Sequence, residues 1–334
     1  MQDNIEVGII GAGAWGSCLA YLFSKKCAKI FVWCRNPSFA EILHTRRENK
    51  KYLEGVYFDK NIEFTSRPRD LEQCQYIFIA IPTVFLRTTL KKFANILTDK
   101  IVYSSIKGIE ESTLLLPSQI IQQEIGNRIR VALFMGPMLA REIVKGLPTT
   151  FVISSDNKED FELIGELLEG YPFRIYFNRD KKGVEFGGAI KNVYAIAFGI
   201  LSGFELGFNA TGALLARVVF EITKIAKEFS VNTQTVYGLS CLSDLITSSF
   251  SPDGRNWRVG YLVSKGKRLE EILQSMPHIP EGIYTLRAVK KIIDDKKLDL
   301  PIAGVLYDIL YKGIDIKEGI ARLLSRPLKE EFYE

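Results

Sequence analysis

The sequence predicts an α/β fold in which a doubly wound N-terminal domain is followed by an all-α C-terminal domain. Its length of 334 residues suits two domains, at about 150 residues each. Up to about residue 180, short apolar runs alternate with helical stretches, which is typical of a largely parallel sheet with crossover helices. Beyond Gly183 the strand signals fade. We therefore expect a sheet-containing domain over residues 1–182 and a helical domain over residues 183–334.

The expected strands are short runs rich in β-branched and aromatic residues. In chain order they cover residues 5–10, 29–33, 76–81, 101–104, 131–134, 149–153 and 174–177. The expected helices of the second domain carry apolar residues at spacings of three and four. They cover residues 189–201, 212–229, 236–248, 269–276, 282–294 and 302–311. Another helix, over residues 17–23, is expected soon after the first strand.

Composition indicates the cellular setting. Hydrophobic residues make up 47% and charged residues 25% of the chain, as in globular proteins. The longest nearly unbroken apolar stretch, residues 193–204, is too short to span a bilayer. Residues 1–4 include an acidic residue where a signal peptide would need positive charge. The five cysteines form no CxxC pair, so we expect a cytoplasmic protein without membrane insertion.

Charge and histidine content disfavour two classes of function. The net charge of +5 is spread along the chain and forms no basic stripe, so nucleic acid is not an expected partner. Only two histidines are present, His44 and His278. We therefore expect no metal site built from histidines, and a mechanism that needs a histidine base is disfavoured.

The strongest local motif is GAGAWG at residues 11–16, which follows an apolar strand and opens a helix. That context is the dinucleotide-binding fingerprint of a Rossmann-type domain. Gly11 would allow the tight turn, Gly13 would let the backbone approach a pyrophosphate, and Gly16 would permit close packing of the helix. The free N–H groups of the helix start would then face the phosphates. An ordinary strand-to-helix turn is the alternative.

The second expected strand is followed by Arg35. A strict NAD binder usually has an acidic residue here to hold the ribose 2′-hydroxyl, but residues 33–38 contain none. An arginine at this point would bind a 2′-phosphate or stack on adenine. A solvated arginine with no ligand is the alternative. We expect both cofactors to work, with NADPH moderately preferred.

Further motifs occur in a fixed order along the chain. They are Asn49 with Tyr52-Leu53, SIKGIE at 105–110, Gly136-Pro137 with Ala140-Arg141-Glu142, EFGGAIKNV at 185–193, Asn209, Asp244, Arg255-Asn256 and Glu281-Gly282. Through these motifs and the GAGAWG turn, the chain resembles the bacterial NAD(P)-dependent glycerol-3-phosphate dehydrogenases over nearly its whole length.

The catalytic residues implied by this resemblance are Lys191, Lys107 and Asp244. Lysine in an apolar helix often only extends its charged end to solvent, so composition alone leaves the role of Lys191 open. Burial near another cation would lower its pKa and allow it to act as a general acid near neutral pH. Lys107 follows an expected strand at the edge of the sheet where ligands of such folds bind. Asp244 would orient the catalytic lysine; an exposed helix aspartate is the alternative.

The resemblance also implies two sets of ligand contacts. The expected cofactor-binding residues are Gly11, Gly13, Ala14, Trp15, Gly16, Arg35, Lys107, Ala140, Arg255 and Glu281. The expected substrate-binding residues are Lys107, Gly136, Met138, Lys191, Asn192, Asp244, Gly254, Arg255 and Asn256. Arg255 follows a turn and begins a helical stretch, where a guanidinium and free N–H groups suit a phosphate.

Two of these positions depart from the family pattern. Met138 stands where the family commonly has serine or threonine, and Gly254 stands where it often has serine. Two side-chain hydroxyls are therefore expected to be missing at the substrate, with consequences for affinity more than for the type of reaction. A backbone N–H at Gly254 is one possible replacement.

The resemblance implies reversible hydride transfer between NAD(P)H and dihydroxyacetone phosphate, giving sn-glycerol 3-phosphate for glycerophospholipid synthesis. Lys191 would protonate the developing alkoxide and Lys107 would stabilise negative charge. A homodimer is expected. The alternatives are a related reductase of another small oxo or hydroxy acid and a nucleotide-sensing homologue with weak catalysis.

Overall fold

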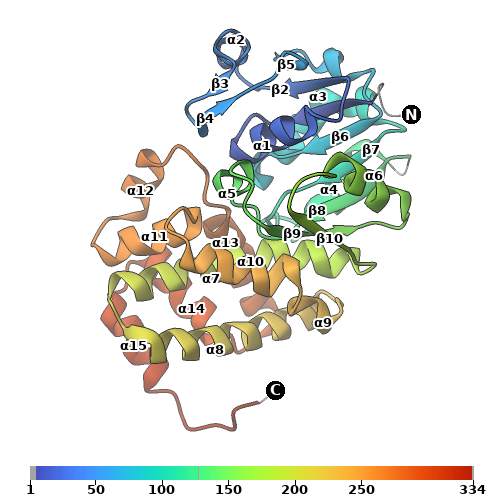
Figure 1. Cartoon of the computed structure of the whole chain (residues 1–334). Coiled ribbons are helices and arrows are strands. Elements are labelled where there is room, and N and C mark those ends of the chain that lie inside the picture. The colour runs from blue at the N-terminus through green and yellow to red at the C-terminus, as the bar shows by residue number, and fades with distance from the viewer. Residues whose placement is uncertain (1–4, 127, 333–334) are drawn as a thin grey trace.

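The computed structural model describes residues 5–126 and 128–332. Residues 1–4, on which the expectation about a signal peptide depends, lie outside this part of the chain. Figure 1 shows an α/β domain packed against a domain of helices, with α7 running beneath the sheet where the two domains meet. Both parts of the fold class predicted from the sequence are confirmed.

The main sheet has eight strands in the order β10-β9-β8-β7-β6-β1-β2-β5. Neighbouring strands are parallel except for β8 and β9, which are antiparallel. The strands are β1 (Glu6–Ile10), β2 (Lys29–Trp33), β5 (Ile62–Thr65), β6 (Tyr76–Ile79), β7 (Ile101–Ser104), β8 (Arg130–Met135), β9 (Thr149–Ser154) and β10 (Phe173–Phe177). All seven expected strands are present within one or two residues of the expected bounds.

Three strands were not expected from the sequence. The edge strand β5 and the two-stranded sheet of β3 (Glu48–Asn49) and β4 (Leu53–Tyr57) are short, and β4 is largely exposed, so neither shows a clear apolar pattern. The expected largely parallel sheet is present, and only β9 and β10 run opposite to its other strands, a detail that the alternation of strands and helices does not reveal.

Helices cover both faces of the main sheet. They are α1 (Ala14–Phe23), α2 (Pro37–Arg46), α3 (Leu86–Leu97), α4 (Pro117–Ile125), α5 (Ala140–Val144) and α6 (Glu159–Leu167), with the 3-10 turns η1 (Pro68–Leu71) and η2 (Thr83–Phe85). One core joins α1, α2, α5 and α6 to the face that carries Phe78, and a second core joins α3 and α4 to the face that carries Ile77 and Ile79. Adjacent residues of β6 thus point to opposite faces, as a strand buried on both sides requires.

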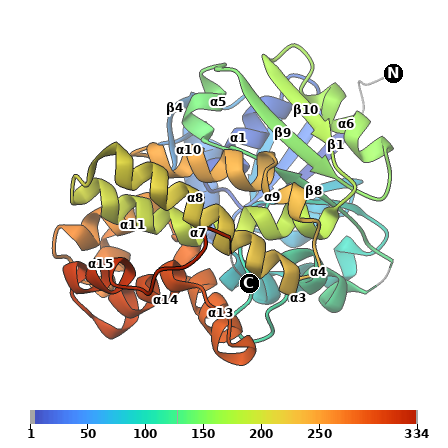
Figure 2. The same cartoon turned by 90° about the horizontal axis from the view of Figure 1, so that it is seen from below.

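The second domain is built around α7 (Lys181–Gly203), and most of its other helices pack against α7 (Figure 2). They are α8 (Gly207–Glu228), α9 (Thr233–Val236), α10 (Asp244–Phe250), α11 (Arg255–Ser264), α12 (Leu269–Ser275), α13 (Glu281–Lys296), α14 (Pro301–Tyr307) and α15 (Ile316–Leu324), with the π-helical turns η3 (Leu239–Ser243) and η4 (Asp308–Lys312). Helix α7 is long and apolar enough to cross a membrane, but 89% of its most apolar window is buried within the protein.

The expectation of one continuous helix over 236–248 is wrong in detail. Gly238 has an extended backbone, with ψ near −173°, and the chain then forms η3 before α10 begins at Asp244. The helix expected over 302–311 is likewise divided into α14 and the π turn η4. Apolar spacing alone does not reveal such local changes of helical winding. Helix α15 was not expected.

Candidate active site

The glycine turn after β1 is shaped for close packing against the sheet. Gly11 has φ +116°, its N–H donates to Trp33 O at 3.1 Å, and a Cβ there would lie 2.6 Å from Ala80 O. Gly13 is the N-cap of α1, and no side chain of the described residues caps it. Because the first turn of α1 carries no acidic residue and a Cβ at Gly13 would meet nothing within 4 Å, the helix start is open to an anion.

A buried asparagine holds this turn. Asn49 Nδ2 donates to Ala12 O at 3.0 Å and to Ser17 Oγ at 2.7 Å, and its Oδ1 accepts from the N–H of Tyr52 at 3.2 Å. Asn49 is fully buried. The Asn49–Tyr52 motif therefore fixes the backbone of the GAGAWG turn and brings the β3–β4 hairpin against it.

Arg35 lies at the end of β2 and is exposed. Its Cζ lies 4.4 Å from the centroid of the Phe85 ring, which comes from η2 after β6, the strand on the other side of β1. No hydrogen bond or ion pair joins the Arg35 side chain to another described residue. The guanidinium thus lies over an aromatic ring and has unoccupied N–H groups, which suits adenine, a 2′-phosphate, or both.

The centre of the site is a carboxylate shared by two lysines. Asp244 Oδ2 lies 2.7 Å from Lys107 Nζ, and Asp244 Oδ1 lies 3.0 Å from Lys191 Nζ. Lys107 also donates to Gly136 O at 2.8 Å. Lys191 and Asp244 are 4% and 2% exposed. The alternative left open by the sequence, that Asp244 is an exposed helix aspartate, is therefore excluded. Loops after β7 and β8 and helices α7 and α10 bring these groups together.

The surroundings set the charge of both groups. Burial lowers the pKa of Lys191 to about 8; Asp244 opposes this shift, while Lys107 and Arg255 add to it. Burial alone would raise the pKa of Asp244, but the two lysines hold it below its usual value. The site therefore contains an ionised aspartate and a lysine able to give up a proton near neutral pH.

Ser248 is a site residue that the sequence reasoning missed. Lys191 Nζ donates to Ser248 Oγ at 2.6 Å, and that hydroxyl lies 3.4 Å from Asp244 Oδ1. The signal in the sequence is helical spacing, because residues 244 and 248 lie one turn apart on α10.

Two asparagines connect the helices of the site. Asn192 Nδ2 donates to Lys107 O at 3.0 Å, and Asn256 Nδ2 donates to Asn192 Oδ1 at 2.8 Å. The N–H of Gly282 in turn donates to Asn256 Oδ1 at 2.9 Å. This chain of bonds links the Lys107 loop to α7, α11 and α13. In this structure both asparagines make hydrogen bonds to protein groups. Contact with substrate would therefore use their remaining hydrogen-bonding positions or require a rearrangement.

The remaining predicted residues lie at the starts of helices. Arg255 begins α11, is exposed, and makes no hydrogen bond or ion pair with a described residue. Its charge nevertheless lowers the pKa of Lys191. Glu281 begins α13 and accepts from Thr83. Ala140 begins α5 and is nearly buried, while Trp15 is half-buried with an unpartnered Nε1.

The two departures from the family pattern have different structural settings. A Cβ at Gly254 would lie 2.5 Å from Ser248 O and 3.0 Å from Ser251 O, so this backbone accommodates no side chain without moving. Met138 is half-buried and packs on the core of the N-terminal domain. A hydroxyl is present at the site, on Ser248 beside Lys191.

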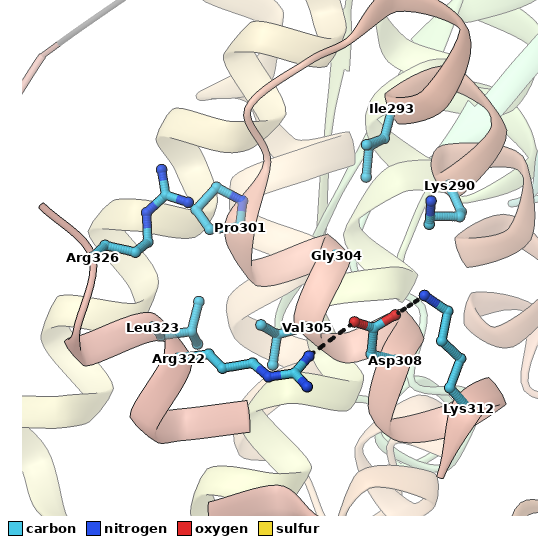
Figure 3. Close-up of a pocket in the computed structure, with 10 residues that line it drawn as sticks. All are labelled: Lys290, Ile293, Pro301, Gly304, Val305, Asp308, Lys312, Arg322, Leu323 and Arg326. Atoms are coloured by element: carbon cyan, nitrogen blue, oxygen red, sulfur yellow. Dashed lines mark hydrogen bonds and ion pairs between the residues drawn. The ribbon is translucent and has the colours of Figure 1, made fainter. Parts of the chain in front are cut away.

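Other cavities are separate from these residues. A cavity of about 530 Å³ opens beside Pro137 and Thr247, the chain neighbours of Met138 and Ser248. A pocket of about 310 Å³ lies among α13, α14, η4 and α15, where Asp308 pairs with Lys312 and Arg322 (Figure 3). The pocket contains no predicted site residue. Within residues 5–126 and 128–332, no group of three or more His, Cys, Asp or Glu side chains could hold a metal.

The fold and the site define a two-domain dehydrogenase of the nicotinamide-dinucleotide class. Models of the N-terminus and C-terminus of NAD-dependent glycerol-3-phosphate dehydrogenase match residues 6–161 and 180–321. The chain belongs to this family.

Relatives match almost the entire chain. Glycerol-3-phosphate dehydrogenase (NAD(P)+) of Pseudomonas aeruginosa strain LESB58 is 36% identical and aligns over 97% of this chain and 95% of its own length. The enzyme of that name from Carboxydothermus hydrogenoformans is 34% identical over 99% of both chains. The crystal structure of glycerol-3-phosphate dehydrogenase from Coxiella burnetii superposes with a TM-score of 0.91 at 27% identity, over 97% of this chain and 100% of that one.

Proposed function

We propose that this protein catalyses reversible hydride transfer between NAD(P)H and dihydroxyacetone phosphate, giving sn-glycerol 3-phosphate. The observation that carries the proposal is the Asp244 carboxylate between Lys107 and Lys191, at the edge of the sheet that also carries the dinucleotide turn. The nicotinamide supplies a hydride to the C2 carbonyl when it is bound. The ammonium of Lys191 would supply a proton to the C2 oxygen. In the reverse direction Lys191 would take the proton back and the oxidised cofactor would accept the hydride.

The other residues bind and orient the substrate. Lys107 places a positive charge beside Lys191 and would stabilise the negative charge that develops on oxygen. Arg255 has no partner among the described residues and lies at a helix start, so we assign it to the substrate phosphate together with Asn256. Asp244 keeps Lys191 in place through a direct contact of 3.0 Å.

The cofactor is held at the start of α1 and at Arg35. Gly11, Gly13 and the free N–H groups after them would bind the pyrophosphate. We infer a moderate preference for NADPH, because Arg35 presents unoccupied donors and no acid follows β2. The chemistry assigned to the residues requires no metal.

The decisive experiment follows absorbance of NADPH and NADH with and without dihydroxyacetone phosphate. We expect oxidation of both cofactors only when the substrate is present. A panel of small oxo acids serves as the comparison. Faster turnover of an oxo acid would identify a related reductase, and cofactor binding without any turnover would identify a nucleotide sensor.

We further propose a cytoplasmic homodimer that provides sn-glycerol 3-phosphate for glycerophospholipid synthesis. The five cysteines are free and buried, which suits a reducing compartment. Leu206, Phe208 and Phe250 are 42%, 92% and 55% exposed and supply apolar surface for a second copy. Light scattering after gel filtration tests the dimer; a mass close to 37.8 kDa would contradict it.

A further inference from the structure

Three segments that are distant in the sequence meet at Thr83. This residue begins the turn η2 after β6, in the α/β domain. Glu281 begins α13 in the helical domain, and Gly108 follows Lys107 in the loop after β7. The contact therefore joins the two domains beside the predicted catalytic lysine.

The contact is a double hydrogen bond to one carboxylate oxygen. Glu281 Oε2 accepts from Thr83 Oγ1 at 2.6 Å and from the N–H of Thr83 at 3.2 Å. No described residue donates to the other oxygen, Oε1. A Cβ at Gly108 would lie 2.3 Å from Thr83 Oγ1 and 2.5 Å from Glu281 Oε2, so the glycine leaves room for this pair.

The surroundings of Glu281 oppose its ionisation only in part. Burial raises the pKa of Glu281 to about 7, and the two bonds from Thr83 lower it. Arg255 on α11 and Lys107 in the loop after β7 also act to lower it. Near neutral pH, the charge of Glu281 therefore depends on Thr83 and on these two cations.

We propose that Thr83 is a positioning residue that orients the Glu281 carboxylate, with Oε1 free to accept a hydrogen bond from the carboxamide of a bound nicotinamide cofactor. This inference rests on the proposed function, because it takes Glu281 to lie at the nicotinamide end of the cofactor site. Thr83 itself touches only the protein.

The test measures cofactor binding to the full chain in the absence of substrate. The fluorescence of NADH and NADPH reports binding, and it is measured across about two pH units on either side of neutrality. Thr83→Val keeps the shape and removes the hydroxyl donor. Because a hydrogen bond to a charged group is lost while the backbone N–H remains, we expect affinity to fall about five- to tenfold. The pH below which affinity declines should also move upward, since Glu281 ionises less readily.

The matched control is Thr83→Ser, which keeps both donors and should bind as the wild type does. In a Glu281→Ala background, Thr83→Val should cause no further loss, because Thr83 acts through Glu281. If Thr83→Val does not fold, as judged by its unfolding curve, Thr83→Ala is measured in the same way.

Two results would overturn the inference. One is a Thr83→Val protein with wild-type affinity and pH profile, and the other is an equal loss in the Glu281→Ala background. Wild-type protein that binds neither cofactor would overturn the proposed function as well. Normal cofactor binding without turnover of dihydroxyacetone phosphate would contradict only the assigned reaction.

Discussion

Lys191 and Asp244 face each other with Nζ and Oδ1 3.0 Å apart, one on α7 and the other on α10. The second oxygen of the same carboxylate binds Lys107. Two cations thus share one buried anion, which leaves an excess of positive charge where a substrate oxygen or phosphate would lie. Such a charge, fixed in a site shielded from water, stabilises developing negative charge without reorganisation during the reaction.

Replacement of Lys191 by methionine keeps the apolar stem and removes the proton donor. We expect turnover with dihydroxyacetone phosphate to fall at least about 100-fold, the usual contribution of general acid catalysis. Cofactor affinity should survive. Single-turnover kinetics measure this directly, with Lys182→Met, an exposed lysine of the same helix, as the control. Near-normal chemistry in Lys191→Met would remove Lys191 from the mechanism.

The pH dependence of the reaction should follow Lys191. Its pKa of about 8 means that ketone reduction, which needs the ammonium, declines as pH rises through that value, while alcohol oxidation increases. Asp244→Asn removes the negative charge that opposes the shift, so the pKa of Lys191 should fall further. Each unit of pKa lowers the ammonium fraction at higher pH about tenfold. Profiles of kcat against pH measure the shift, and Asp253→Asn, an exposed aspartate, is the control. An unmoved profile in Asp244→Asn would contradict the pairing.

Arg35→Ala should reduce the preference for NADPH. A charge-assisted hydrogen bond to the 2′-phosphate contributes about 1.5–3 kcal/mol, and exposure favours the lower end, so the ratio of kcat/KM for the two cofactors should change roughly tenfold. Both ratios are measured at one ionic strength. Arg46→Ala, at the exposed end of α2, is the control. An unaltered ratio would leave Arg35 a role in stacking only.

Gly254→Ser should lower activity, although the family often has serine at this position. Its Cβ would lie 2.5 Å from Ser248 O, so α10 must move and with it the hydroxyl that contacts Lys191. Overpacking of this kind costs about 1–3 kcal/mol of stability. Kinetics and denaturant unfolding measure both effects.

Two comparisons make the Gly254 experiment decisive. Gly254→Ala introduces the same Cβ without a hydroxyl and should be equally harmful. Gly212→Ser, on an exposed part of α8 where a Cβ meets nothing within 4 Å, should be neutral. Tighter substrate binding in Gly254→Ser would mean that the backbone adjusts freely and that the missing hydroxyl is a real deficit.

Local sequence was sufficient for the features that depend on short-range patterns. Apolar runs located seven of the strands, and the GAGAWG turn indicated an anion site because strand, glycines and helix start are contiguous in the chain. Spacing did not locate β3, β4 and β5, which are short and of which β4 is largely exposed, or the break before Asp244, which depends on the backbone of Gly238.

The sequence by itself determined the order of an α/β part and a helical part, the glycine turn after β1 and, through its resemblance to a family, the identity of the candidate lysines. Only the tertiary structure decided which groups meet. Ser248 reaches Lys191 because α10 packs against α7 within the helical domain. Phe85 lies under Arg35 because both follow strands of the same sheet. Thr83 reaches Glu281 because the turn after β6 meets the start of α13 in the other domain. The charge of Lys191 was also decided there, since burial and neighbouring cations, rather than residue type, lower its pKa.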